Sequence, residues 1–211
     1  MEIYIVRHGQ TEWNKEKRLQ GSTDIALTEK GVAMAVESGR NLMDTHFDRI
    51  YTSPLSRARV TAEGFRGGRD IPILIDDRLR ELSFGSYEGH TLEELLAQDP
   101  ACTFQYFFSD PARYKAPSDG ETLEQLIDRA SRFLTEEIEP LAENPSITRV
   151  MLVAHGAINK ALMCHVRQHG VEEFWSGGLQ RNCNVIILDY SNQKYTVLDE
   201  SRIFYKPSSS K

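Results

Sequence analysis

Short segments rich in Ile, Val and Tyr recur along the chain. Residues 2–6 alternate between apolar and polar positions as a half-buried strand does. The same character returns in residues 49–52, 71–75, 149–154 and 185–188. We predict that these five segments are the strands of one sheet.

Amphipathic helical patterns lie between the predicted strands. Residues 28–43 begin at Thr28, a residue type that favours the N-cap, and residues 54–65 have Pro54 near the first turn. In residues 121–138 apolar side chains recur at helical spacing. Two further helices are expected over residues 157–168 and 171–175.

Strands that alternate with helices favour an α/β architecture. We expect a three-layer α/β/α sandwich around a mostly parallel sheet, formed by a single domain over residues 1–205. Ligands of such folds bind at the carboxyl ends of the strands. Functional residues should therefore follow the predicted strands.

Two segments depart from this alternation. Residues 99–119 hold five aromatic residues and three prolines without a clear period, so we expect a small lid-like insertion there, with peripheral packing as the alternative. The tail over residues 206–211 is short and polar, and we expect it to be disordered.

Charge and composition narrow the class of function. The 211 residues include 25 Lys and Arg against 31 Asp and Glu, so no basic field is present that would attract nucleic acid or an anionic membrane surface. No apolar run approaches the roughly 20 residues of a membrane-spanning helix, and the first residues resemble a strand more than a signal peptide. We expect a cytoplasmic protein.

The cysteines point the same way. Cys102, Cys164 and Cys183 are odd in number, lie far apart and show no C-x-x-C spacing. Neither a disulfide framework nor a zinc site is expected from this pattern.

Candidate chemistry follows the first predicted strand. Arg7, His8 and Gly9 stand at its carboxyl end, with Asn14 shortly after. The arginine offers a planar fork of donors for two phosphate oxygens, the glycine lets a backbone approach closely, and Asn14 could donate a neutral hydrogen bond. His8 could attack phosphorus in such a site. An Arg-His pair on its own is more often a surface or capping feature.

Further blocks follow in order along the chain. They are R-H-G-Q-T-E-W-N at 7–14 with Gln20, Gly21, Asp24, Leu27, Thr28 and Gly31; S-P-L-S-R-A at 53–58 with Thr61 and Ala62; Glu81 with Gly85 and Y-E-G at 87–89; G-E-T at 120–122; and His155 with Gly156. Together these blocks closely resemble the signature of the histidine phosphatase superfamily. The resemblance covers most of residues 1–160.

The resemblance implies a role for each matching residue. His8 would be the phosphorylated residue, flanked by Arg7, Arg57 and His155, and Glu81 would donate a proton and later activate water. A neutral imidazole inside a ring of cations suits the loose transition state of phosphoryl transfer. Neither a metal nor a cofactor is expected. The implied phosphate contacts are Arg7, Asn14, Gln20, Gly21, Arg57, His155 and Gly156.

Local sequence alone favours other interpretations of some residues. Arg57 lies beside Arg59, as a solvated charge on a helix would. Glu81 closes the segment D-R-L-R-E, in which an ion pair with Arg78 or Arg80 is expected.

A second pair of histidines has metal-like spacing. His165 and His169 lie four apart on one predicted helix face, but no H-E-x-x-H motif or acidic third ligand accompanies them. We expect both at the surface.

Two features favour water as the phosphoryl acceptor. In the mutases of the family that this chain resembles, the corresponding glutamate is followed by an arginine, whereas Leu82 follows Glu81 here. In addition, residues 99–119 carry only Arg113 and Lys115 as cations. We predict hydrolysis of a small phosphorylated metabolite by a monomer or homodimer. The alternatives are a cofactor-dependent phosphoglycerate mutase and an inactive phosphoryl-binding module.

Overall fold

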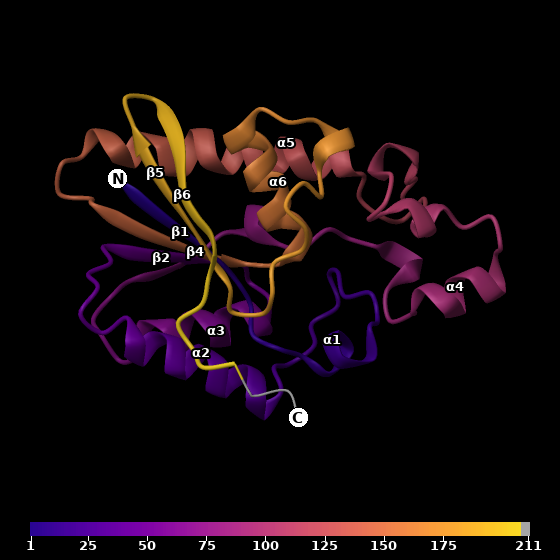
Figure 1. Ribbon diagram of the computed structural model, residues 1–211, viewed down its shortest axis with the longest axis horizontal. Coiled ribbons are helices and arrows are strands. Elements are labelled where there is room, and N and C mark those ends of the chain that lie inside the picture. Colours follow the sequence, from indigo (N-terminus) through magenta and orange to yellow (C-terminus); the bar gives the residue numbers. More distant parts are fainter. Residues whose placement is uncertain (208–211) are drawn as a thin grey trace.

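The computed structural model describes residues 1–207 and shows a sheet between two helical layers (Figure 1). The strand order is β3-β2-β4-β1-β5-β6. β1 to β4 run parallel, whereas β5 and β6 are antiparallel to their neighbours. The strands are β1 (Glu2–Arg7), β2 (Arg49–Thr52), β3 (Ile73–Ile75), β4 (Arg149–Ala154), β5 (Val185–Ser191) and β6 (Lys194–Arg202). The mostly parallel sheet is confirmed.

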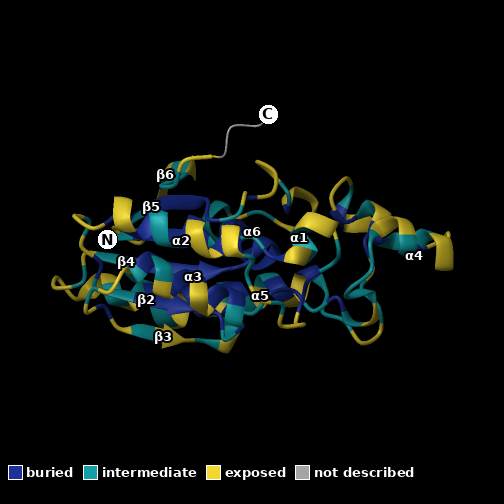
Figure 2. Cartoon of the chain, turned by 90° about the horizontal axis from the view of Figure 1, so that it is seen from below, coloured by how far each residue is buried: buried dark blue, intermediate teal, exposed yellow. Residues whose placement is uncertain are grey.

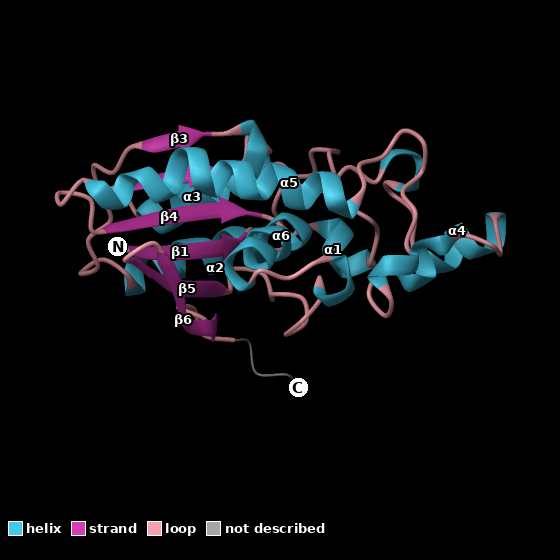
Figure 3. Cartoon of the chain, turned by 90° about the horizontal axis from the view of Figure 1, so that it is seen from above, coloured by secondary structure: helices cyan, strands magenta, loops and turns pink. Residues whose placement is uncertain are grey.

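Alternate residues of β1 enter two different cores. Ile3 and Ile5 pack in the cluster that includes α5 (Leu123–Phe133) and α6 (Gly156–Arg167). Tyr4 and Val6 pack in the cluster on the other face, with α2 (Glu29–Asn41) and α3 (Ser56–Arg66). This period of two gives the predicted three layers, which Figure 1 shows with α5 and α6 on one side of the sheet and α2 and α3 on the other, while Figure 3 looks onto the strands side by side.

Local hydrogen bonds fix where the helices begin. The Thr28 side chain accepts from Gly31 N at the start of α2, and Thr122 caps α5 in the same way. α3 begins at Ser56, two residues later than Pro54, and its N-cap Leu55 makes no side-chain capping bond. Two short helices escaped the sequence analysis, α1 (Glu12–Glu16) and α4 (Leu92–Gln98), because each is too short to show a period.

Several predicted boundaries were wrong, and the strand expected over 185–188 continues to Ser191. The helix expected over 121–138 is α-helical only to Phe133 and continues as a π turn at Leu134–Ile138, and the one expected over 171–175 is a 3₁₀ turn at Val171–Glu173. The strand expected over 71–75 begins at Ile73, because Pro72 before it has no N–H to donate to the sheet.

β6 is the strand that the sequence analysis missed. Its residues are mostly polar and are exposed or half-buried, as suits an edge strand that pairs on one side. Asn192 and Gln193 join it to β5 with φ angles of 50° and 58°, a combination typical of a tight type I′ hairpin.

The aromatic insertion is packed against the domain core. Phe104, Phe107 and Tyr114 are buried and belong to the same core cluster as α5 and α6. α4 lies at the far end of the molecule and is largely exposed (Figure 2). The expected disordered tail falls largely on residues 208–211, outside the described residues.

The remaining expectations concern surfaces and cysteines. Within residues 1–207 no helix combines the length and the apolarity that crossing a membrane would require. Cys102, Cys164 and Cys183 are buried and free.

Candidate active site

The parallel register of the central strands gathers the candidate residues. Arg7, the last residue of β1, pairs with Ala154, the last residue of β4, so His8 and His155 both lie one residue beyond the sheet. Their ring centroids are 5.1 Å apart. Arg57 reaches the same place from the first turn of α3, which follows β2. The predicted location at the carboxyl ends of the strands agrees with this arrangement.

One hydrogen bond determines the tautomer of His8. Its Nδ1 lies 2.7 Å from the carbonyl oxygen of Gly9, which can only accept, so Nδ1 carries the proton and Nε2 keeps a lone pair. The side chain is 3% exposed. Burial, followed by the charges of Arg57 and Arg7, lowers the pKa of His8 well below its usual value. The imidazole is therefore neutral near pH 7 and has a free Nε2 lone pair.

Gly9 serves a packing role in addition. A Cβ at this position would lie 2.6 Å from the carbonyl oxygen of Gly31, in the first turn of α2. The missing side chain therefore lets α2 approach the strand end, which differs from the expected approach to a phosphate.

Arg57 is fully buried, so its interpretation as a surface charge was wrong. Its guanidinium donates to Gly21 O at 2.7 Å, to Thr23 O at 2.8 Å and to His155 Nδ1 at 3.1 Å. Burial lowers its pKa to about 10, which leaves the group charged at neutral pH. Gly21 thus holds Arg57 through its carbonyl group.

His155 is neutral for the same kind of reason as His8. Because its Nδ1 accepts from Arg57, the proton is on Nε2, which lies 2.8 Å from Ser53 Oγ. Burial, followed by the charge of Arg57, lowers the pKa of His155 well below its usual value. The imidazole of His155 is therefore neutral near pH 7.

Glu81 is held by the start of α6. Its carboxylate accepts from Leu82 N, Ala157 N and Ile158 N at 2.9 to 3.0 Å. The first N–H groups of α6 thus bind the glutamate, as favoured by the helix dipole. The local ion pair proposed for Glu81 was wrong, since Arg78 pairs with Asp76 and Arg80 with Asp77.

A cavity of about 430 Å³ contains six of the predicted residues. They are Arg7, His8, Asn14, Gln20, Glu81 and Gly156. Gly156 leaves room for Leu179, because a Cβ there would lie 2.9 Å from Leu179 Cδ1, whereas Glu81 Oε2 and Arg7 Nε would lie at ordinary contact distances of 3.6 and 3.7 Å. Arg57, His155 and Gly21 are not among the residues that line the cavity.

Two residues that line the cavity have buried hydrogen-bond donors without an acceptor among the described residues. Arg7 Nε and Gln20 Nε2 are buried and have no hydrogen-bond partner among the described residues. Asn14 Oδ1 accepts from Thr11 N and from Asn182 Nδ2, both at 3.1 Å, which turns the Asn14 amide nitrogen the other way. Unpaired buried donors are costly, so an oxyanion in the cavity would satisfy them.

Part of the cavity lining is apolar. Its aromatic members are Trp13, Phe84, Phe104, Phe107, Phe108 and Trp175. Trp175 packs against Phe107 and Phe108 with centroids 5.2 and 4.8 Å apart, and its buried indole Nε1 has no partner among residues 1–207. The insertion therefore builds one side of the site.

A loop after α6 contacts Arg7, His8 and Gly9 at the end of β1. Asn182 Nδ2 lies 3.0 Å from His8 O and 3.2 Å from Gly9 O, and the Gln180 carbonyl accepts a hydrogen bond from the guanidinium of Arg7.

A family model matches most of the chain. The model of the histidine phosphatase superfamily (branch 1) matches residues 3–201. The chain belongs to the histidine phosphatase superfamily.

Relatives of this histidine phosphatase superfamily member carry different names. A probable 2-carboxy-D-arabinitol-1-phosphatase of Arabidopsis thaliana is 36% identical over 190 residues, which are 89% of this chain and 38% of the plant protein. A probable phosphoglycerate mutase of Escherichia coli is 31% identical over 191 residues, covering 90% of this chain and 85% of the relative. The chain thus spans well under half of the plant protein.

Among solved structures, Bacillus stearothermophilus YhfR is similar to this chain with a TM-score of 0.85. The two are 36% identical, and the match covers 94% of this chain and 96% of YhfR. The α/β fold predicted from the sequence is shared with it.

Some residues of this superfamily member lie beyond the recognised blocks. Gln180, Asn182 and Trp175 carry no motif in the sequence, and only the crowding of aromatic residues in 99–119 gave a signal for the apolar wall.

Proposed function

We propose that this chain is a metal-independent phosphomonoesterase, in which His8 takes the phosphoryl group from a small phosphorylated metabolite and passes it to water. The observation that carries the proposal is the hydrogen bond between His8 Nδ1 and Gly9 O. It keeps Nε2 available as a nucleophile on a buried neutral imidazole, beside the cations Arg7 and Arg57.

Two steps complete the reaction. In the first, the Nε2 lone pair forms a bond to phosphorus while the bond from phosphorus to the alcohol oxygen breaks, and Glu81, which must begin this step as the protonated acid, gives that oxygen its proton and becomes a carboxylate. In the second, Glu81 takes a proton from water, the water oxygen bonds to phosphorus and the P–N bond breaks. Histidine and glutamate return to their initial states.

The unpaired donors support a phosphoryl group in the cavity. Arg7 Nε, Gln20 Nε2 and the Asn14 amide would donate to the equatorial oxygens. Because these donors are already in place, they can stabilise the charge of the transition state without rearrangement. Arg57 and His155 would act from behind His8, through charge and through their mutual hydrogen bond.

The lining of the cavity favours hydrolysis over the mutase alternative. A mutase must also bind the carboxylate of a sugar acid, but much of the remaining cavity lining is aromatic. Of the two further cations there, Arg18 is paired with Glu16 and Glu94 at 2.8 and 2.7 Å, which leaves Lys17. The leaving alcohol would contact the aromatic side chains, with Trp175 Nε1 as its donor.

Turnover assays test this proposal. We expect the full chain to hydrolyse p-nitrophenyl phosphate in the presence of EDTA, His8→Ala to lose this activity, and the exposed-site control His46→Ala to keep it. With 3-phosphoglycerate and a trace of 2,3-bisphosphoglycerate, we expect free phosphate. An inactive wild type or an active His8→Ala variant refutes the mechanism, and rapid formation of 2-phosphoglycerate refutes hydrolysis as the main reaction.

A further inference from the structure

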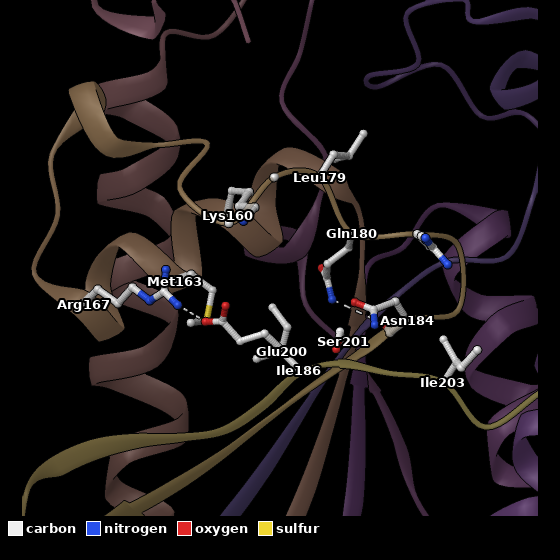
Figure 4. Close-up of a pocket in the computed structure, with 13 residues that line it drawn as sticks. Lys160, Met163, Arg167, Leu179, Gln180, Asn184, Ile186, Glu200, Ser201 and Ile203 are labelled. Atoms are coloured by element: carbon white, nitrogen blue, oxygen red, sulfur yellow. Dashed lines mark hydrogen bonds and ion pairs between the residues drawn. The ribbon is translucent and has the colours of Figure 1, made fainter. Parts of the chain in front are cut away.

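A second cavity lies behind the loop that holds Arg7. Its volume is about 370 Å³, and α6, the loop over residues 177–184 and β6 contribute to it (Figure 4). Leu179 lines both this cavity and the one that contains His8. No step of the proposed reaction uses it.

Lys160 is the unusual group in this second cavity. The residue lies on α6 and is 7% exposed, and its Nζ donates to Ser176 O at 2.7 Å. The Ser176 carbonyl accepts only one of the three N–H donors of the Lys160 ammonium. No carboxylate of residues 1–207 lies within ion-pair distance of this ammonium. Burial lowers its pKa. A buried ammonium is normally paired with an anion, and Lys160 has no such partner among residues 1–207.

The charges around Lys160 favour an anionic ligand. Arg167 and Arg181 also line the cavity, against the single carboxylate of Glu200. Glu200 is already paired with Arg167. Two positive charges are therefore left over in a chain whose formal net charge is −6.

The second cavity is connected to the active site through Gln180. The carbonyl of Gln180 accepts from Arg7, and its side-chain Oε1 accepts from Asn159 Nδ2 at 2.8 Å. Asn159 is the residue before Lys160 on α6. A ligand bound at Lys160 would contact the same loop that fixes the Arg7 guanidinium.

We propose that this cavity binds a small oxyanion through Lys160, with inorganic phosphate as its occupant, and that binding there alters the affinity of the His8 site through Gln180 and Arg7. The binding site stands independently of the proposed function. The effect on turnover rests on it, because phosphate would then be the product of the reaction.

Phosphate binding to the full chain tests the site. Equilibrium dialysis with labelled phosphate should count one phosphate fewer for Lys160→Met than for wild type, while Lys160→Arg and the exposed control Lys194→Met should match wild type. Equal counts in Lys160→Met and wild type, with the variant folded by circular dichroism, would overturn the proposal. The difference between these two proteins is informative even if neither turns over substrate.

Two further measurements refine the test. Citrate is titrated in competition with phosphate, and retention of phosphate at the Lys160 site is the expected result; replacement by citrate would overturn phosphate as the occupant. Phosphate should inhibit wild-type turnover with a non-competitive component that Lys160→Met lacks. The same inhibition pattern in both proteins would overturn the connection through Gln180.

Discussion

The Nδ1 proton of His8 is held by the adjacent Gly9 carbonyl, while Arg57 and Glu81 are held by partners far away in the chain. Arg57 donates to carbonyl groups near residue 21, and Glu81 accepts from the first N–H groups of α6. At this scale, each functional group is oriented by backbone atoms. Side-chain rotamers alone would not keep a nucleophile, a cation and a carboxylate in place.

We predict that Glu81→Gln slows substrates with a poor leaving group much more than substrates with a good one. Loss of the proton donor should lower kcat/KM for an alkyl phosphate such as glycerol phosphate by about 10²- to 10⁴-fold. The loss should be much smaller for p-nitrophenyl phosphate, whose leaving group needs little protonation. Glu124→Gln, an exposed change on α5, is the control. Equal losses on both substrates would contradict Glu81 as the proton donor.

The family blocks identified His8, Arg7, Arg57, His155 and Glu81 from sequence, but local sequence misplaced two of them. Arg57 and Glu81 look like surface charges beside their neighbours in the chain, because the groups that bury them come from remote segments. Gln180 contacts Arg7 through its backbone carbonyl, and Asn182 makes its contacts through an ordinary side-chain amide. Neither has a pattern that sequence analysis could detect.

At the scale of elements, strand ends and one irregular loop form the site. β1 and β4 are central strands, and their apolar runs have the boundaries expected from sequence to within one residue. β6 and α4 were missed because a polar edge strand and a short exposed helix show little periodicity. The loop over residues 177–184 lacks regular structure, yet it fixes both Arg7 and the backbone of His8.

We predict that Asn182→Ala weakens substrate binding through Asn14. Without Asn182 Nδ2, the Asn14 amide loses one of its two orienting bonds, and a bond of this kind contributes about 1 kcal/mol. KM should rise about fivefold, and Asn182→Ala should add little to Asn14→Ala in a double-mutant cycle.

The matched control for this cycle is Asn41→Ala. Like Asn182, Asn41 donates from its side-chain amide to a backbone carbonyl, in this case Phe204 O at 2.6 Å, but Asn41 lies on α2 and does not line the cavity. Fully additive effects of the Asn14 and Asn182 changes would show that Asn182 does not position Asn14.

At the scale of the whole molecule, the chain buries two neutral histidines and a charged arginine at the junction of its two cores. This arrangement keeps the imidazole of His8 neutral, at a cost in stability at low pH. The oligomeric state and the cytoplasmic location stay predictions.

We predict an acid-sensitive stability that originates at His8 and His155. Both pKa values are lowered in the folded chain, so between the usual value near 6.5 and the lower folded values the unfolded chain binds more protons. The free energy of unfolding should therefore fall as pH falls through this window, by up to about 1.4 kcal/mol per pH unit for each histidine.

Urea unfolding at pH 7.5, 6.5 and 5.5 measures this effect. A double variant with His8→Asn and His155→Asn should lose less stability on acidification, and His46→Gln should behave as wild type. Parallel losses in the double variant and wild type would contradict neutral burial of the two histidines.

The most direct test of the account is to locate the phosphoryl group during turnover. The full chain is mixed with p-nitrophenyl phosphate, quenched under conditions that preserve phosphohistidine, and analysed by peptide mass spectrometry. We predict a phosphoryl group on His8 that forms and decays at least as fast as turnover, and none in His8→Ala. Turnover without a phosphoryl group on His8, or with one on another residue, would contradict the mechanism.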